Sequence, residues 1–240
     1  MEEIAREVDM LVGKKDFDGA EALLLSRLEE ASREGWPGIE LSLCSELMGF
    51  YRQRLNRDGY YAARDRAFSL LKTVRPEPAA RGTILVNAAT GMTAFGDEKD
   101  ALQIYREAEI LYRRALGPAD HRLASLYNNM AFAYSGMGDA AGAERYIRKA
   151  MEVLEKLPHH PDMGTSWLNL ALLYAAADPD DPRIGECLSS AMACFDDPEA
   201  VWDGYYAHTV RKCAAGFAAM GMAAEAADLE ERAELIYEGT

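Results

Sequence analysis

The spacing of apolar side chains between residues 123 and 136 has the period of an α-helix. One stripe is apolar and follows spacings of four, three and four residues: Leu123, Tyr127, Met130 and Tyr134. The opposite stripe is mixed and consists of Ser125, Asn129, Phe132 and Gly136, with Asn128 at its flank. This pattern predicts an amphipathic helix whose apolar stripe packs on a core. The mixed stripe then faces water or a ligand.

Helices of this kind recur along the chain in pairs. A turn with glycine or aspartate, then a small residue in a second helix, occurs six times, with the small residue at Ala20, Ala63, Ala101, Ala143, Cys187 and Ala226. The successive intervals of 43, 38, 42, 44 and 39 residues give a period of about 41. In such a turn, glycine can end the first helix and aspartate can cap the second. Links that contain proline separate the pairs.

This organisation predicts twelve helices in six antiparallel pairs and no strand. Single pairs cannot bury their apolar sides alone, whereas stacked pairs form a continuous core. We therefore expect one domain over residues 1–240, with approximate repeats at residues 1–36, 37–78, 79–118, 119–160, 161–197 and 198–240.

The fourth repeat, LYNNMAFAYSGMGDAAGAERYIRKAMEVLEKLP, resembles a tetratricopeptide repeat. Its long period and its lead-in LGPADHRLASLYNNMAFAY resemble the longer repeats of kinesin light chains and related bacterial proteins. The resemblance covers nearly the whole chain, although the fifth turn is longer and carries Cys187 where the family has alanine. It implies an all-α, right-handed superhelical solenoid of about six helix pairs. It also implies that peptides or protein segments bind along a concave face lined by the first helices.

Three of the five asparagines stand nine residues before a turn, at Asn87, Asn129 and Asn169. A carboxamide offers both a donor and an acceptor, so it can pair with the C=O and the N–H of a peptide backbone. Proteins that resemble this family use asparagines at the corresponding place for that purpose. We therefore predict that these three residues, with Asn128 beside them, hold an extended partner segment. The alternative is a set of solvated amides on a polar helix face.

Neighbouring positions extend the predicted peptide-binding face. One turn before the asparagine register stand Thr83, Ser125, Thr165 and His208. In the sixth repeat Lys212 occupies the register, and Arg211 and His208 share its face. This basic end could receive a carboxylate of the partner. The alternative is ordinary solvated charge on the last repeat.

The charge of the chain narrows the range of partners. The formal net charge is −14 and the pI is about 4.8. An acidic protein repels phosphate backbones and anionic membrane surfaces, so we expect neither nucleic acid nor membrane as a partner. No signal peptide and no apolar run of about 20 residues is visible, which predicts a cytoplasmic protein. The four cysteines then read as free, mostly buried thiols.

No sequence motif supports catalysis, and we expect no enzyme and no cofactor. Residues 178–182, DPDDP, lack the pattern of a calcium loop, and residues 159–162, HHPD, lack the spacing of a metal site, so we expect no metal. The function predicted from the sequence is a scaffold that binds protein or peptide. Two alternatives stay open: a bacterial sensor of signalling peptides, and self-association into a homodimer through the apolar stripe of the last helix, Ala226, Leu229, Ala233 and Ile236.

Overall fold

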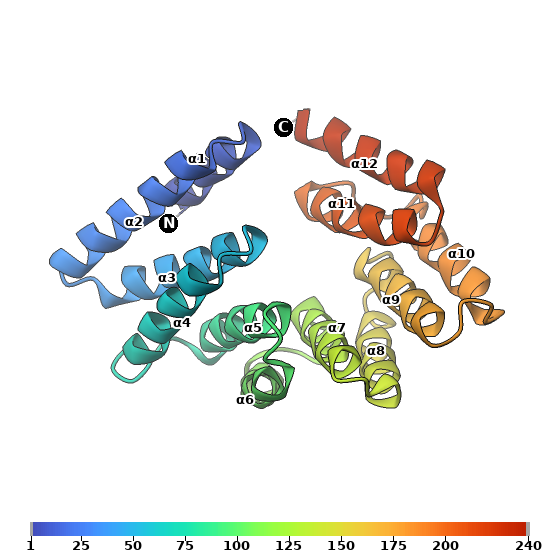
Figure 1. Cartoon of the computed structure of the whole chain (residues 1–240), viewed down its shortest axis with the longest axis horizontal. Coiled ribbons are helices and arrows are strands. Elements are labelled where there is room, and N and C mark those ends of the chain that lie inside the picture. The colour runs from blue at the N-terminus through green and yellow to red at the C-terminus, as the bar shows by residue number, and fades with distance from the viewer. Residues whose placement is uncertain (1, 239–240) are drawn as a thin grey trace. The chain divides into compact units, whose positions relative to one another are not determined.

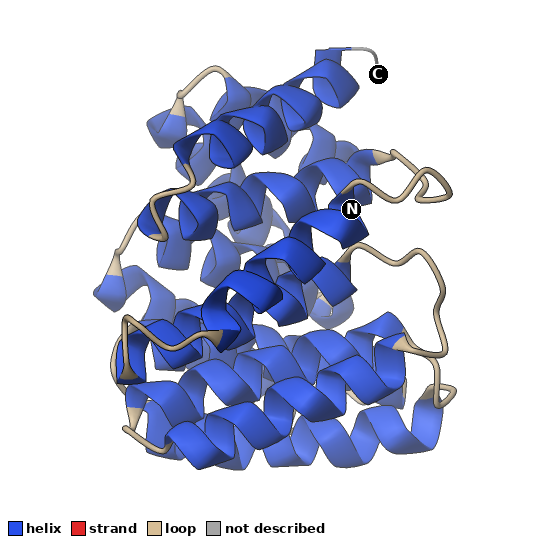
Figure 2. Ribbon diagram, turned by 90° about the vertical axis from the view of Figure 1, so that its right-hand side faces the viewer, coloured by secondary structure: helices blue, strands red, loops and turns tan. Residues whose placement is uncertain are grey.

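The computed structural model describes residues 2–238, and within that range the chain forms twelve α-helices and no strand (Figures 1 and 2). In chain order the helices are α1 (Glu2–Gly13), α2 (Phe17–Arg33), α3 (Pro37–Gln53), α4 (Arg57–Leu70), α5 (Pro78–Ala94), α6 (Glu98–Ala115), α7 (His121–Gly136), α8 (Ala140–Leu154), α9 (Asp162–Ala177), α10 (Arg183–Phe195), α11 (Gly204–Ala219) and α12 (Ala223–Glu238). The prediction of an all-α fold built from helix pairs is confirmed.

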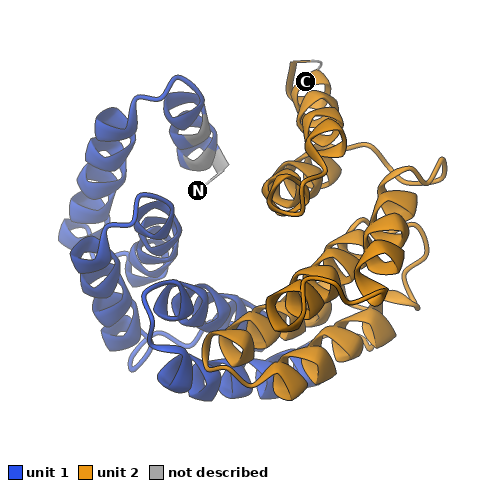
Figure 3. Cartoon of the chain, turned by 45° about the vertical axis from the view of Figure 1, so that its right-hand side comes forward, with its two compact units in different colours: residues 1–115 blue, residues 116–240 orange. Residues whose placement is uncertain are grey.

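The helices fall into two compact units, Met1–Ala115 and Leu116–Thr240 (Figure 3). Each unit holds three helix pairs, and the two helices of every pair pack on each other. First helices also contact the first helix of a neighbouring pair: α3 contacts α5 in unit 1, and α9 contacts both α7 and α11 in unit 2. Side chains on successive first helices therefore meet within a unit. The single domain predicted over residues 1–240 stays a prediction.

The turns inside the pairs have the predicted chemistry. Gly96, Gly138 and Gly221 adopt φ values of 88°, 76° and 78°, in the left-handed region where glycine fits without strain. At the next helix start, the Asp139 side chain accepts a hydrogen bond from the Gly142 N–H at 2.8 Å. Side-chain caps of this kind also come from Asp16, Asn56, Asp120 and Asp203.

The second pair departs from the small-residue rule. Asn56 caps α4, and the position four residues after the cap, which is alanine in the first and fourth pairs, is Tyr60. The alignment on Ala63 was therefore wrong by three residues. Tyr60 is 0% exposed and packs against Gly91 of α5, where an added Cβ would lie 2.0 Å from the tyrosine Cε2. A glycine on α5 thus replaces the missing alanine on α4.

The predicted core stripe of α7 is buried. Leu123, Tyr127, Met130 and Tyr134 are all at most 8% exposed. Leu126 and Ala131 are buried as well, because α7 packs on α9 in addition to its pair partner α8. Phe132 is 68% exposed, as expected for a member of the opposite stripe.

Other parts of the sequence take structural roles within the described residues. Arg57, the first residue of α4, pairs with Asp97 at 3.3 Å and stacks on Tyr61. All four cysteines are free, and three of them are buried. None of the helices in residues 2–238 has both the length and the apolar character that crossing a membrane requires.

Candidate functional site

Two asparagines join the first helices of unit 2. Asn169 of α9 donates a hydrogen bond through Nδ2 to the Oδ1 of Asn128 on α7, at 3.2 Å. Asn128 in turn donates through its own Nδ2 to the hydroxyl of Ser166 on α9, at 3.0 Å. These two bonds form a short polar ladder between successive repeats. We name the side of α7 and α9 that carries Asn128, Phe132, Asn169 and Leu172 the first-helix face.

The ladder runs one residue away from the predicted register. Asn128, which the sequence placed at the flank, makes the contact with α9. Asn129 is half-buried, and its amide has no hydrogen-bond partner within residues 2–238. Counting back from the turns predicts which residue contacts the next helix only to within about one position. Asn128 makes the contact because α9 packs on the side of α7 that carries it. The role predicted for Asn129 stays a prediction.

Unit 1 repeats this relation. Asn87 of α5 donates to the hydroxyl of Ser45 on α3 at 2.9 Å, across 42 residues of sequence. The corresponding bond from Asn169 spans 41 residues, so both amides reach the neighbouring first helix at the same repeat position. Thr83 is exposed, and its hydroxyl lies 2.9 Å from the hydroxyl of Tyr112 on α6. Asn87, Asn128 and Asn169 therefore link neighbouring repeats, a role that the sequence pattern alone does not predict.

Substitution of Asn87 by alanine should lower the free energy of unfolding by about 1 kcal/mol, because the inter-repeat bond to Ser45 is lost. Asn129→Ala should change it by less than about 0.5 kcal/mol, since no bond is broken. Urea unfolding of both variants measures this difference. Equal losses of unfolding free energy in the two variants would contradict a linking role for Asn87. Adding Ser45→Ala to Asn87→Ala should lower the free energy of unfolding little further, because the bond between the two side chains is already lost.

The first-helix face of unit 2 is hollowed beside the ladder. A pocket of about 160 Å³ lies between α7, α8 and α9. Its lining combines the two amides with apolar side chains: Asn128, Ala131, Phe132, Ser135, Ala143, Ile147, Asn169, Leu172 and Leu173. The Phe132 ring, 68% exposed, is the largest apolar surface at its edge. The pocket can take an apolar side chain while the amides pair with a backbone.

The other predicted residues of unit 2 lie along the same helices. Thr165 is half-buried, with its hydroxyl 3.4 Å from the Sγ of Cys213 on α11, and burial raises the pKa of that thiol to about 11. Ser125 donates to a carboxylate oxygen of Asp162 at 3.3 Å. The exposed Arg211 places its guanidinium 4.7 Å from the centre of the Tyr237 ring. The remaining two residues of the predicted basic end, His208 and Lys212, are also exposed on α11.

The stripe predicted to mediate self-association is largely used within unit 2. Leu229 and Ala233 are 0% exposed and Ala226 is 7% exposed, because α12 packs them against α11. Leu235 and Tyr237 are the large apolar side chains of α12 that stay exposed, at 62% and 42%. The homodimer stays a prediction.

A second hollow of unit 2 lies at the N-terminal ends of its first helices. It measures about 410 Å³, and its lining includes His121, His159, His160, Asp203 and Tyr205. His121 is the first residue of α7, and Tyr205 is the second residue of α11. Burial lowers the pKa of His160, which favours its neutral ring. The adjacent His159 and His160 are visible as a pair in the sequence, whereas His121 stands 39 residues before His160 and no local pattern connects it to them.

Comparisons with known proteins agree with this architecture. The family profile described as "Tetratricopeptide repeat" matches residues 80–156 and 122–181. The crystal structure of BtubC (BKLC) from P. vanneervenii superposes with a TM-score of 0.61 and 19% identity, covering 91% of this chain and 89% of that one. The "nearly identical TPR-like repeats" of a kinesin light chain from Podosopora anserina give a TM-score of 0.55 and 20% identity, covering 82% and 94%. No curated protein sequence matches the chain.

Tetratricopeptide repeats are typically non-catalytic and support protein–protein interaction. The matched segment holds α5 to α9, with the Asn128–Asn169 ladder and the pocket beside Phe132. Residues 80–181 of this chain therefore match the tetratricopeptide-repeat profile, and the fold of the chain is similar to that of the two solved repeat structures.

Proposed function

We propose that this chain is a scaffold that holds an extended segment of a partner protein on the first-helix face. The observation that carries the proposal is the pocket of about 160 Å³, because it sets apolar walls beside two carboxamides. An extended segment offers a backbone donor and acceptor together with a side chain at alternate positions. The amides suit the backbone, and the pocket suits one apolar side chain.

The exposure of Phe132 supports this assignment. The remaining large apolar side chains of α7 are buried, whereas the Phe132 ring is 68% exposed at the pocket edge. Aromatic side chains in such positions are common energetic centres of protein interfaces, since they bury a large area with few rotatable bonds. Asn169 donates to Asn128 through Nδ2 and keeps its Oδ1 for a ligand N–H.

The positive charge on α11 supports one orientation of the bound segment. Arg211 and Lys212 are exposed on this helix of unit 2, in a chain whose net charge is −14. α11 packs on α9, which carries Asn169. A segment that lies on the amides with an acidic side chain or a terminal carboxylate toward α11 would therefore meet local positive charge. We propose a mixed apolar and acidic segment as the ligand.

Selection from a displayed library of random peptides tests this function. The immobilised full chain should enrich peptides with an apolar residue near an acidic one. Asn169→Ala should lower the affinity for the enriched peptides by about tenfold, because an amide contact that the peptide would bury is lost. Asn56→Asp, which keeps a capping side chain on α4, is the matched control and should leave binding unchanged. Enrichment that is equal on wild type and Asn169→Ala would contradict the assignment.

A further inference from the structure

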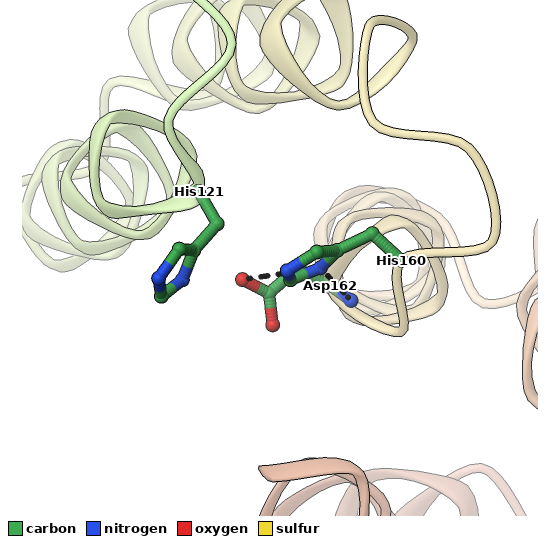
Figure 4. A group of neighbouring side chains, drawn as sticks. All are labelled: His121, His160 and Asp162. Atoms are coloured by element: carbon green, nitrogen blue, oxygen red, sulfur yellow. Dashed lines mark hydrogen bonds and ion pairs between the residues drawn. The ribbon is translucent and has the colours of Figure 1, made fainter. Parts of the chain in front are cut away.

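Three side chains of unit 2 with metal-binding chemistry meet at the edge of the larger pocket. One ligand atom each from His121, His160 and Asp162 lies within 4.8 Å of the other two. Two of these residues begin first helices, at the starts of α7 and α9, and His160 stands in the link just before α9. In the view of Figure 4, the Asp162 carboxylate lies between the two imidazole rings.

Asp162 is a buried carboxylate whose basic neighbour is an imidazole, that of His160, with Nδ1 at 3.9 Å from Oδ2. The residue is 7% exposed, and no lysine or arginine pairs with it within residues 2–238. Its Oδ2 accepts hydrogen bonds from the hydroxyls of Tyr205, at 2.8 Å, and Ser125, at 3.3 Å. Buried carboxylates are normally paired with a cation or coordinate a metal, because an isolated buried charge is costly. The surroundings of Asp162 therefore call for a positive charge.

The contact between Asp162 and His160 brings two acceptors face to face. The Asp162 N–H donates to Nδ1 of His160 at 3.3 Å, so this ring nitrogen carries a lone pair. The same Nδ1 lies 3.9 Å from Oδ2 of the Asp162 carboxylate. Two lone-pair atoms at this separation repel each other in the absence of a proton or cation between them. A metal ion bound to both would take the Nδ1 lone pair in place of the long hydrogen bond from the Asp162 N–H, and it would convert the repulsion into attraction.

We propose that His121, His160 and Asp162 bind a divalent transition-metal ion, with Zn²⁺ as the best fit. Two imidazoles and one carboxylate are a common three-ligand set for zinc, whereas Ca²⁺ and Mg²⁺ prefer more oxygen ligands. The fourth position opens toward the pocket of about 410 Å³. Tyr205 is a positioning residue, since its hydroxyl bonds Asp162 and lies 3.3 Å from Nδ1 of His121.

The distances allow this with a small rearrangement. Ligand atoms on a tetrahedral zinc lie about 3.4 Å apart, from bonds of about 2.1 Å. The present separations of up to 4.8 Å must therefore shorten by about 1.4 Å. His121 is half-buried at the first turn of α7, so rotation of its side chain can supply this movement. The ion would then tie the link before α9 to the start of α7.

Calorimetric titration of the full chain, without a histidine tag, with ZnCl₂ tests the site. Wild type should bind one Zn²⁺ per chain with a rise in Tm, because the ion binds the folded state. His121→Gln and His160→Gln should each weaken binding by more than about 100-fold, and Tyr205→Phe by about tenfold. His159→Gln is the matched control, since both nitrogens of that ring already contact Asp197 and Glu199. It should bind Zn²⁺ as wild type does.

Co²⁺ provides a second readout of the same site. Bound Co²⁺ should show the visible absorption of a low-coordinate nitrogen and oxygen site, without a thiolate charge-transfer band. His121→Gln is the safest variant, because the side chain is only half-buried. Failure of wild type to bind Zn²⁺, unchanged binding by His121→Gln, a loss in His159→Gln equal to that in His160→Gln, or a thiolate band would each overturn the assignment.

Discussion

Replacing Gly91 by alanine is expected to lower the free energy of unfolding by about 3 kcal/mol, which corresponds to a fall in Tm of roughly 6–12 °C. The new Cβ would lie 2.0 Å from Cε2 of Tyr60, closer than any carbon–carbon contact allows. Tyr60 cannot retreat, since its side chain is 0% exposed and its hydroxyl donates to the carbonyl of Ala88. Thermal unfolding followed by circular dichroism measures the change.

Gly49→Ala is the control for the effect of alanine in a helix. Gly49 lies within α3, and an added Cβ there meets nothing within 4 Å. The free energy of unfolding of this variant should rise by about 0.5–1 kcal/mol, because alanine has a higher helix propensity than glycine. Tyr60→Leu removes the ring atoms that would clash with the new Cβ. In the Tyr60→Leu variant, Gly91→Ala should therefore lower the free energy of unfolding by at least about 1 kcal/mol less than it does in wild type. A loss at Gly91 that is unchanged by Tyr60→Leu would contradict the close-packing explanation.

Replacing Phe132 by alanine is expected to weaken binding of a selected peptide by about 30-fold or more. The ring forms the exposed apolar edge of the pocket beside Asn128 and Asn169, where a bound side chain would cover it. The free energy of unfolding should change by less than about 0.5 kcal/mol, since the ring is already 68% exposed. Fluorescence anisotropy of a labelled peptide measures the affinity, and urea unfolding measures the stability.

Ile110→Ala is the matched control for this prediction. Ile110 is a large apolar residue of α6, 55% exposed and outside the first-helix face. Its removal should leave peptide affinity unchanged. A similar loss in both variants would indicate non-specific apolar contact and contradict a defined site at Phe132.

Apolar periodicity and turn chemistry were sufficient to predict the helix pairs. The stripe from Leu123 to Tyr134 is buried as predicted, and the turn glycines Gly96, Gly138 and Gly221 lie in the left-handed region. The sequence did not reveal Tyr60 at a small-residue position, because the space for its ring comes from Gly91 on another helix. Local patterns report on one helix, whereas this exchange involves two.

The candidate site was predicted less completely, for a similar reason. The period placed asparagines along one side of the first helices. The inter-repeat ladder uses Asn128 instead of Asn129, because the packing of α9 on α7 decides which of the two neighbours is reached. The group of His121, His160 and Asp162 was missed, since His121 and Asp162 are a whole repeat apart and meet only when repeats stack. A signal was present: His121, Asp162 and Tyr205 each stand at the start of a first helix.

Native mass spectrometry of the chain, purified gently from its own cells, tests the central claim most directly. Wild type and the double variant Phe132→Ala, Asn169→Ala are compared under identical conditions. We expect wild type to carry the additional mass of a bound peptide or protein segment, and the double variant to lose it while keeping its helical content. Wild type with no bound segment, or an equal bound mass on both proteins, would contradict a binding role for the first-helix face.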